Sequence, residues 1–441
     1  MAAPSSQRHF SSCTLVALRK ESRVIQGDRD DPRSTNNDRP AHLEVNSLRL
    51  SGDRGMAHRS LNILRPALLV MTLTQCTEPS APPIEPCLSL ERFDSTMVQF
   101  METQNIKAGV LGVMKGGRLV YDKSFGWQDE AQEITLPQGA MMRLASVTKP
   151  ITAAAVRELI DSELVDLDDF VFDLGQPEGG ILTLMPFPSL GDSLLKKITV
   201  QHLLQHRGGW DRDLAGDLTF KEIVIADAMN VPSPPGRTNT IRYILGQPLQ
   251  FSPGTKTAYA NIGYLVLGLI VEEVSGEDFL SYVTTTLFEP LGVPNGELIQ
   301  GRTFPVDRSP REPWYDSDTM SQNVFDPNGP PVEIPNGGWD VESRISSGGL
   351  VGSARSIVEF LDVYQTAGDG IGTRRRGAEG SGWRWYHTGS LPGTNTLARQ
   401  RGDGINYAVL FNKRPSAGES YSSQIRSKID AILDSEFLCW P

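Results

Sequence analysis

Apolar positions recur with two different periods at the start of the folded part of the chain. Residues 88–104 carry apolar side chains at helical spacing on one face, which predicts an amphipathic helix. Two strand-like runs follow, at 108–113 and 118–125. Between them, Gly116 and Gly117 supply the glycines that a tight turn needs, so we expect the two runs to form a β-hairpin.

The pattern changes beyond this hairpin and changes back near the C-terminus. Helical patterns and loops rich in Gly and Pro dominate residues 146–344. Strand-like runs return at 383–387, 394–400 and 406–412, and a helical pattern covers 420–437. This order of elements is typical of one antiparallel sheet that is interrupted in sequence. The chain is therefore predicted to form an α/β domain of the α+β type, with a five-stranded antiparallel sheet, terminal helices beside it and a large, mostly helical insertion.

The N-terminal residues read differently from this domain. Residues 28–40 contain almost no apolar side chain and show no period, so we interpret residues 1–55 as a disordered extension. At Met56 a new pattern begins, in which basic residues precede a short apolar stretch. This is the layout of a secretory signal peptide, here covering 56–76, and it leaves open whether translation starts at Met1 or at Met56.

The signal-like segment ends in Leu73-Thr74-Gln75-Cys76, which resembles a bacterial lipoprotein processing box, although Gln75 stands where a small residue is expected. Cys76 is thus a candidate lipid anchor, followed by a Pro-rich linker at 77–86. These features predict export to the periplasm or the cell envelope. The alternative is a disordered arm with a chance apolar patch, as in a cytoplasmic protein.

Composition and charge exclude several classes of protein. The 42 Lys and Arg residues against 53 Asp and Glu give a formal net charge of −11, which argues against a nucleic-acid binder. The chain has no apolar run of about 18 residues, the length that a membrane-spanning helix needs. No Cys-x-x-Cys pair indicates structural zinc. An acidic enzyme or binding protein remains.

If the chain is exported, its four cysteines can form disulfides, because disulfides form in oxidising compartments. Cys13 and Cys76 would then be removed or modified. Cys87 and Cys439 lie at the two ends of the folded part, and we expect them to pair. Two unrelated free thiols, the usual state in a cytosolic protein, are the alternative.

A Ser-x-x-Lys motif, Ser146 to Lys149, opens a long amphipathic helix. Residues three apart lie on one helix face, so the ammonium of Lys149 can reach the hydroxyl of Ser146. Serine needs such a neighbour to act as a nucleophile. A second copy of the motif, Ser193 to Lys196, has a less regular setting and is interpreted as a chance match. Taken alone, Ser146 is equally explained as an ordinary helix N-cap.

Two further motifs extend this chemistry. Tyr259 and Asn261 form a Tyr-x-Asn motif in a turn-rich loop before an apolar helix, and a tyrosine beside a cation can transfer protons. His387-Thr388-Gly389 is placed at the end of a predicted strand, with Ser390 next. A substrate can lie along such a strand edge, and a free backbone amide there can stabilise an oxyanion.

Ser-x-x-Lys, Tyr-x-Asn and a Lys/His-Thr-Gly triplet, in this order, resemble the motifs of the penicillin-recognising serine hydrolases related to class C β-lactamases. Segments 201–209 and 347–350 are also similar to stretches of that family, and the resemblance covers about residues 88–437. It implies a β-lactamase/transpeptidase-like fold. The serine hydrolase domain would then span 87–441, with a sheet part at 87–145 and 345–441 and a helical part at 146–344.

The resemblance also implies roles for single residues. Ser146 would be the acylated nucleophile, while Lys149 and Tyr259 would share the proton transfer. Asn261 would hold the amide or ester side of the substrate. The backbone N–H groups of Ser146 and Ser390 would form the oxyanion hole. Acyl transfer of this kind needs no metal and no organic cofactor.

The third motif departs from the β-lactamase pattern, because His387 stands where typical members have a lysine. A histidine is mostly neutral at pH 7, which weakens the case for β-lactam hydrolysis. Histidine at this place is more similar to the D-aminopeptidases and the lactamase-like peptidases and esterases of the superfamily. A purely structural strand histidine is the alternative interpretation of His387.

The sequence thus favours a serine hydrolase that acts on a small ester, amide or peptide. A β-lactamase or DD-carboxypeptidase is the first alternative, and a penicillin-binding sensor or interaction protein without turnover is the second. His202 and His206 have a spacing that can bind zinc, yet no His-Glu-x-x-His motif is present. The acyl group, the natural substrate and the oligomeric state are not indicated by the sequence.

Overall fold

A computed structural model describes residues 89–375, 384–435 and 438–440 of this chain. The predicted extension, signal peptide, linker and Cys87 lie outside these residues. Cys439 is disulfide-bonded, and its pairing with Cys87 stays a prediction. No helix of the described part is long and apolar enough to cross a membrane.

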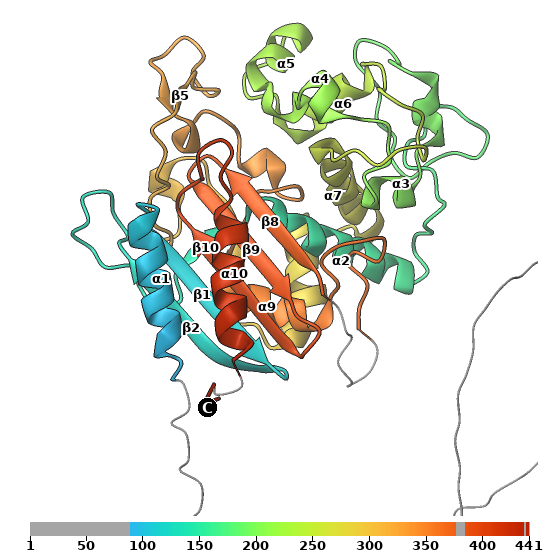
Figure 1. The fold of residues 1–441 in the computed structure, drawn as a ribbon. Helices are drawn as coiled ribbons and strands as arrows, with labels where there is room; N and C mark the ends of the chain where they lie inside the picture. Colours follow the sequence, from blue (N-terminus) through green and yellow to red (C-terminus); the bar gives the residue numbers. More distant parts are fainter. Residues whose placement is uncertain (1–88, 376–383, 436–437, 441) are drawn as a thin grey trace, which may run out of the picture. The chain divides into compact units, whose positions relative to one another are not determined.

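Among the described residues, five strands form an antiparallel sheet in the order β2-β1-β10-β9-β8 (Figure 1). This confirms the predicted sheet and its interruption in sequence. The turn between the first two strands uses Gly116 and Gly117, both with positive φ, as the hairpin prediction requires. The strands are β1 (Ala108–Lys115), β2 (Arg118–Gly126), β8 (Tyr386–Leu391), β9 (Thr394–Gln400) and β10 (Ile405–Phe411).

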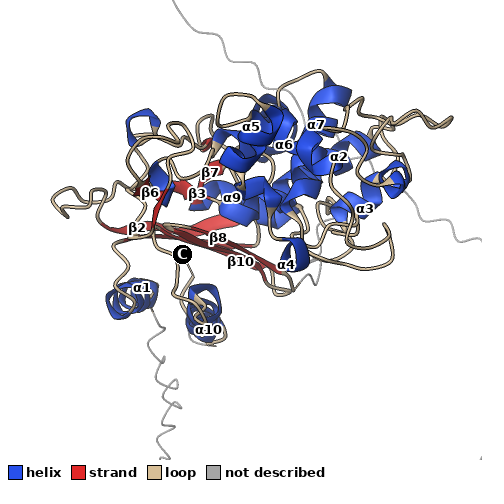
Figure 2. Ribbon diagram, turned by 90° about the horizontal axis from the view of Figure 1, so that it is seen from above, coloured by secondary structure: helices blue, strands red, loops and turns tan. Residues whose placement is uncertain are grey.

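The sheet is covered on both faces, so the side chains of its central strands are buried on either side. Helices α1 (Glu91–Thr103) and α10 (Tyr421–Leu433) lie together on one face, and α9 (Ala354–Val363) lies on the other (Figure 2). In β10, Val409 contributes to the core beneath the terminal helices, whereas Leu410 contributes to the core on the α9 side. This alternation follows from the two-residue period of a strand.

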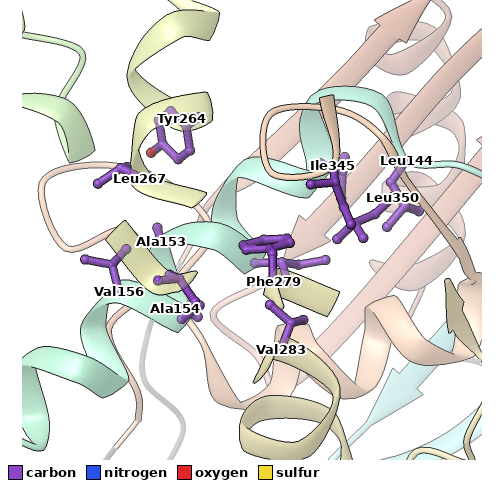
Figure 3. Packing of buried hydrophobic residues seen from close by; sticks show 14 of the residues in the cluster. Leu144, Ala153, Ala154, Val156, Tyr264, Leu267, Phe279, Val283, Ile345 and Leu350 are labelled. Atoms are coloured by element: carbon purple, nitrogen blue, oxygen red, sulfur yellow. The ribbon is translucent and has the colours of Figure 1, made fainter. Parts of the chain in front are cut away.

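The larger core joins the sheet to the helical part. Side chains of α2 (Thr148–Asp161), α7 (Asn261–Ser275) and α8 (Phe279–Val283) pack together near Leu144, Ile345 and Leu350 (Figure 3). The other helices of this part are α3 (Val200–Leu204), α4 (Arg212–Ala215), α5 (Glu222–Met229) and α6 (Gly236–Leu245). The shorter helical turns are η1 (Ala145–Val147), η2 (Ser193–Lys197), η3 (Leu218–Phe220), η4 (Thr284–Phe288), η5 (Glu289–Leu291), η6 (Pro305–Asp307), η7 (Ile334–Asn336) and η8 (Glu342–Arg344).

The middle of the chain also contains short strands outside the five-stranded sheet. β7 (Leu350–Ser353) pairs with β3 (Met141–Arg143) on one side and with β4 (Leu298–Gln300) on the other. A second small pair joins β5 (Met320–Ser321) to β6 (Val332–Glu333). Strands of two to four residues are too short to show a clear two-residue period in the sequence.

Candidate active site

The turn that carries Ser146 is fixed from two sides. Leu144, which follows β3, donates its backbone N–H to the Leu350 carbonyl at 2.8 Å, and its own carbonyl accepts a hydrogen bond from Thr396 Oγ1 at 2.9 Å. Ala145 then adopts φ +48, a left-handed conformation that is uncommon for alanine. Ser146 follows in η1, immediately before α2. The strained turn is therefore held by β7 and β9, the strands to which Leu350 and Thr396 belong.

Lys149 lies in the first turn of α2 and is completely buried. Its Nζ donates to Ser146 Oγ at 3.2 Å and to the backbone carbonyl of Ser347 at 2.5 Å. The structure thus places the two ends of the Ser-x-x-Lys motif in contact, as the helical spacing predicts. The Ser347 carbonyl, which lies just before β7 in the family-like segment 347–350, is a second partner of the ammonium.

Tyr259 reaches the same serine from the loop before α7. Its phenol hydroxyl donates to Ser146 Oγ at 2.8 Å, and Lys149 Nζ lies 5.0 Å from the centroid of its ring. The imidazole of His206 stacks on the ring with a centroid separation of 4.5 Å. Ser146 Oγ is therefore contacted by both groups that the sequence proposed for proton transfer.

Asn261 is the first residue of α7, two residues beyond Tyr259. Its side-chain amide donates to Asp217 Oδ2 at 2.6 Å. Asp217 also accepts hydrogen bonds from the backbone and the hydroxyl of Thr219, so its carboxylate is a fixed acceptor for the Asn261 amide. Asp217 lies 44 residues before its partner and belongs to no recognisable motif, so no local signal in the sequence indicates it.

The third motif lies inside β8 and not at the end of a strand, because β8 extends to Leu391 through its pairing with β9. Within the described sheet β8 is an edge strand. A Cβ at Gly389 would lie 2.4 Å from the Leu144 carbonyl oxygen and 2.2 Å from Thr396 Oγ1. Glycine is thus required here because β8 packs directly against the turn that carries Ser146.

The electrostatics of the site predict a neutral His387 at physiological pH. Burial, together with the charge of Lys149, lowers the pKa of His387 to about 4. Its Nδ1 lies 3.1 Å from the Thr388 carbonyl, so the neutral ring donates from Nδ1. The third motif therefore contributes no fixed positive charge to the site.

A cavity of about 570 Å³ opens beside Ser146. It combines an aromatic wall, charged groups of both signs, and the residues that follow the third motif. The lining residues are Ser146, Arg212, Asp213, Asp217, Phe220, Asn261, Ser321, Ile334, Gly338, Trp339, Arg344, Ser347, Gly348, Ser390, Leu391, Pro392 and Arg414. Ser146 and Ser390, the two residues whose amides were proposed as the oxyanion hole, thus face the same space.

The two histidines considered for zinc have other partners. His202 Nδ1 accepts the backbone N–H of Thr199 and so caps α3, while His206 Nδ1 accepts the backbone N–H of Ala260 at 3.3 Å. The described residues contain no cluster of three or more potential metal ligands.

The lowered pKa of His206 predicts that the folded protein loses stability in acid. Burial, followed by the nearby charge of Lys149, lowers the pKa of His206 to about 3. The unfolded chain, with an ordinary histidine pKa of about 6.5, binds a proton that the folded protein excludes, so the stability is complete above pH 6.5 and is lost as the pH falls. We expect the free energy of unfolding to drop by about 2 kcal/mol more between pH 7.5 and 5.0 in the unaltered protein than in His206→Asn.

Urea unfolding at the two pH values measures this difference. Asparagine is the suitable replacement because His206 has φ +55, a conformation that asparagine tolerates, and an amide oxygen can accept the Ala260 N–H. An equal pH dependence in the two proteins would contradict the prediction.

Comparison with known proteins identifies relatives of this chain. Over 299 residues the chain is 24% identical to Esterase EstB of Burkholderia gladioli, which covers 65% of this chain and 73% of that protein. It is 24% identical over 204 residues to Protein flp of Staphylococcus aureus (strain COL), covering 46% of this chain but 37% of that relative's length. The crystal structure of D-amino acid amidase from Ochrobactrum anthropi SV3, in complex with L-phenylalanine amide, has the same fold, with a TM-score of 0.53 at 19% identity over 77% of this chain and 97% of that one.

A family model described as Beta-lactamase matches residues 93–426, which include all three motifs and every strand of the five-stranded sheet. The order of the motifs, the sheet and the contacts around Ser146 agree with this match. The chain therefore belongs to the Beta-lactamase family, as a hydrolase related to the class C β-lactamases.

Proposed function

We propose that this protein hydrolyses ester or amide bonds of small molecules through an acyl-enzyme on Ser146. The observation that carries the proposal is the contact of one serine oxygen with both Tyr259 and Lys149 at the wall of the cavity. A serine hydroxyl becomes an effective nucleophile when neighbouring groups can take its proton. The buried ammonium of Lys149 is held in place by the Ser347 carbonyl, so the arrangement is preorganised.

The reaction would proceed in two acyl-transfer steps. In the reactive form Tyr259 is a phenolate, its proton lost to solvent and its charge balanced by the Lys149 ammonium. Ser146 Oγ attacks the carbonyl carbon while its proton passes to this phenolate, and the resulting oxyanion accepts hydrogen bonds from the backbone N–H groups of Ser146 and Ser390. The tetrahedral intermediate then collapses, and the leaving alcohol or amine takes the proton. Water attacks the acyl-enzyme by the same route and releases the acid.

Two observations support esters and amides over β-lactams as substrates. His387 is neutral, so the third motif offers no permanent cation to a substrate carboxylate. The relatives that match include a protein named as an esterase, and a D-amino acid amidase shares the fold. Asn261 lines the cavity and is fixed by Asp217, and its role in this proposal is to hold the polar side of either kind of bond.

A side-by-side assay tests this ranking. The purified protein is given short-chain aryl esters, D-amino-acid amides and a chromogenic cephalosporin, with enzyme pretreated with a fluorophosphonate as the blank. We expect kcat/KM for an ester or an amide to exceed that for the cephalosporin by at least about tenfold. A clear preference for the cephalosporin would overturn the ranking. A stoichiometric burst without turnover on all three substrates would show an acylated sensor in place of a hydrolase.

A further inference from the structure

Arg212 places a cation over the face of Tyr259. Its guanidinium carbon lies 4.3 Å from the ring centroid, within the range of a cation–π contact. Arg212 also lines the cavity beside Ser146. Its Nε lies 3.8 Å from the carboxylate of Asp213, but both side chains are exposed, so this ion pair is screened by water.

The structure holds Arg212 in this position through the loop that carries Tyr259. Asp211, almost completely buried, accepts a hydrogen bond from Lys256 Nζ at 2.6 Å and caps α4 by accepting the backbone N–H of Asp213. Lys256 belongs to the same loop as Tyr259. The hydrogen bond from Lys256 is also the main reason why the pKa of Asp211 lies below its usual range, so this pair stays ionised at neutral pH. The helix that presents Arg212 is thus tied to the tyrosine that Arg212 covers.

The ionisable groups around the ring come from four elements and from the turn after α3. Burial, followed by the nearby charges of Lys149 and Arg212, disfavours a positive charge on His206, which stacks on Tyr259. Of the groups around the tyrosine, Lys149 and Arg212 carry fixed positive charge, whereas His206 and His387 are neutral. The surrounding groups are Lys149 of α2, His206 after α3, Arg212 of α4, Tyr264 of α7 and His387 of β8.

We propose that Arg212 is a positioning residue that supplies, over the face of Tyr259, a positive charge which the third motif lacks in this protein. The inference rests on the proposed acyl transfer at Ser146. The Tyr259 phenolate is the form that accepts the proton of Ser146, and a cation over the ring stabilises its negative charge before the transfer. The same contact keeps the phenol hydroxyl directed at Ser146 Oγ.

The pH dependence of a neutral ester, 4-nitrophenyl acetate, tests the proposal, because an uncharged substrate is not attracted by a surface arginine. For Arg212→Gln we expect kcat/KM at pH 7 to fall by about fivefold, with KM unchanged and the acidic limb of the pH–rate profile moved to higher pH. Arg212→Lys, which keeps the charge, should retain most of the rate and the original limb.

Two further variants make the test specific. Arg426→Gln is the matched control, because Arg426 of α10 lies at the same 4.3 Å from the ring of Tyr386 but does not line the cavity, and its profile should be unchanged. His387→Lys in the Arg212→Gln background returns a cation to the third motif and should restore the acidic limb.

The outcomes distinguish a failure of this inference from a failure of the proposed acyl transfer at Ser146. If Arg212→Gln leaves the profile in place, or lowers the rate at every pH by one factor, the proposal is wrong, since a structural role alone would not move the limb. Failure of His387→Lys to restore the limb would also count against it. If the unaltered protein does not turn over the ester, the acyl-transfer function itself is wrong. Fluorophosphonate labelling of each variant shows that the protein is folded and that Ser146 is accessible.

Discussion

Ser146→Ala is expected to abolish ester hydrolysis, with kcat/KM for a short-chain aryl ester lowered by at least about 10³-fold. The hydroxyl of Ser146 is the point at which Tyr259 and Lys149 converge, and alanine leaves both without a nucleophile to activate. The same variant should no longer be labelled by a fluorophosphonate, which intact-protein mass spectrometry would show. The fold should be retained, because the turn is held by the backbone of Leu144 and not by the serine side chain.

The chain provides its own control for this experiment. Ser193 begins the second Ser-x-x-Lys copy, but it is exposed in the short helical turn η2, which Asp192 caps. Ser193→Ala should leave labelling and turnover unchanged. If Ser146→Ala kept the activity of the unaltered protein, or if Ser193→Ala lost it, the assignment of the nucleophile would be wrong.

Lys149→Met should lower kcat/KM by about 10²- to 10⁴-fold, the range that general acid–base groups contribute. Methionine has a similar length and can fill the completely buried space, so the variant removes the ammonium with little change in packing. The Ser347 carbonyl loses a donor, and an unsatisfied buried acceptor costs about 1–3 kcal/mol of stability. Thermal unfolding measured beside the kinetics separates this loss of stability from the loss of rate.

Lys196→Met, in the second motif copy, is the matched control and should have ordinary kinetics. Lys149→Met should also react much more slowly with the fluorophosphonate while remaining folded, because Ser146 keeps its hydroxyl but loses one of the two groups that activate it. A Lys149→Met enzyme with more than about a tenth of the original kcat/KM would rule out a principal role in proton transfer.

Local sequence signals predicted the features that depend on neighbouring residues. The contact between Ser146 and Lys149 follows from helical spacing, and the turn between β1 and β2 follows from two glycines. The order of helices and strands was enough to predict the interrupted sheet. In each case the partners lie within one element or within adjacent ones.

Contacts between distant segments were not accessible in this way. Tyr259 lies 113 residues from the serine that it contacts, and it was assigned to the site through a resemblance and not through spacing. Arg212 and Asp217 belong to no motif, because their importance comes from the tertiary packing of α4 and η3 against the loop before α7. His387 was placed at a strand end since the pairing of β8 with β9, which fixes the ends of β8, has no local signature.

Because the sheet is interrupted in sequence, its strands cannot all pair until the C-terminal part of the chain has been synthesised. β1 is paired with β2 on one side and with β10 on the other, yet β10 is translated about 290 residues after β1 ends. At a ribosomal rate of about 5–20 residues per second, the open edge of β1 and the apolar faces of the first hairpin stay exposed for tens of seconds before β10 is synthesised. The nascent chain therefore needs protection from aggregation over that interval, and we expect its yield to depend on chaperones more strongly than that of a protein whose neighbouring strands are consecutive.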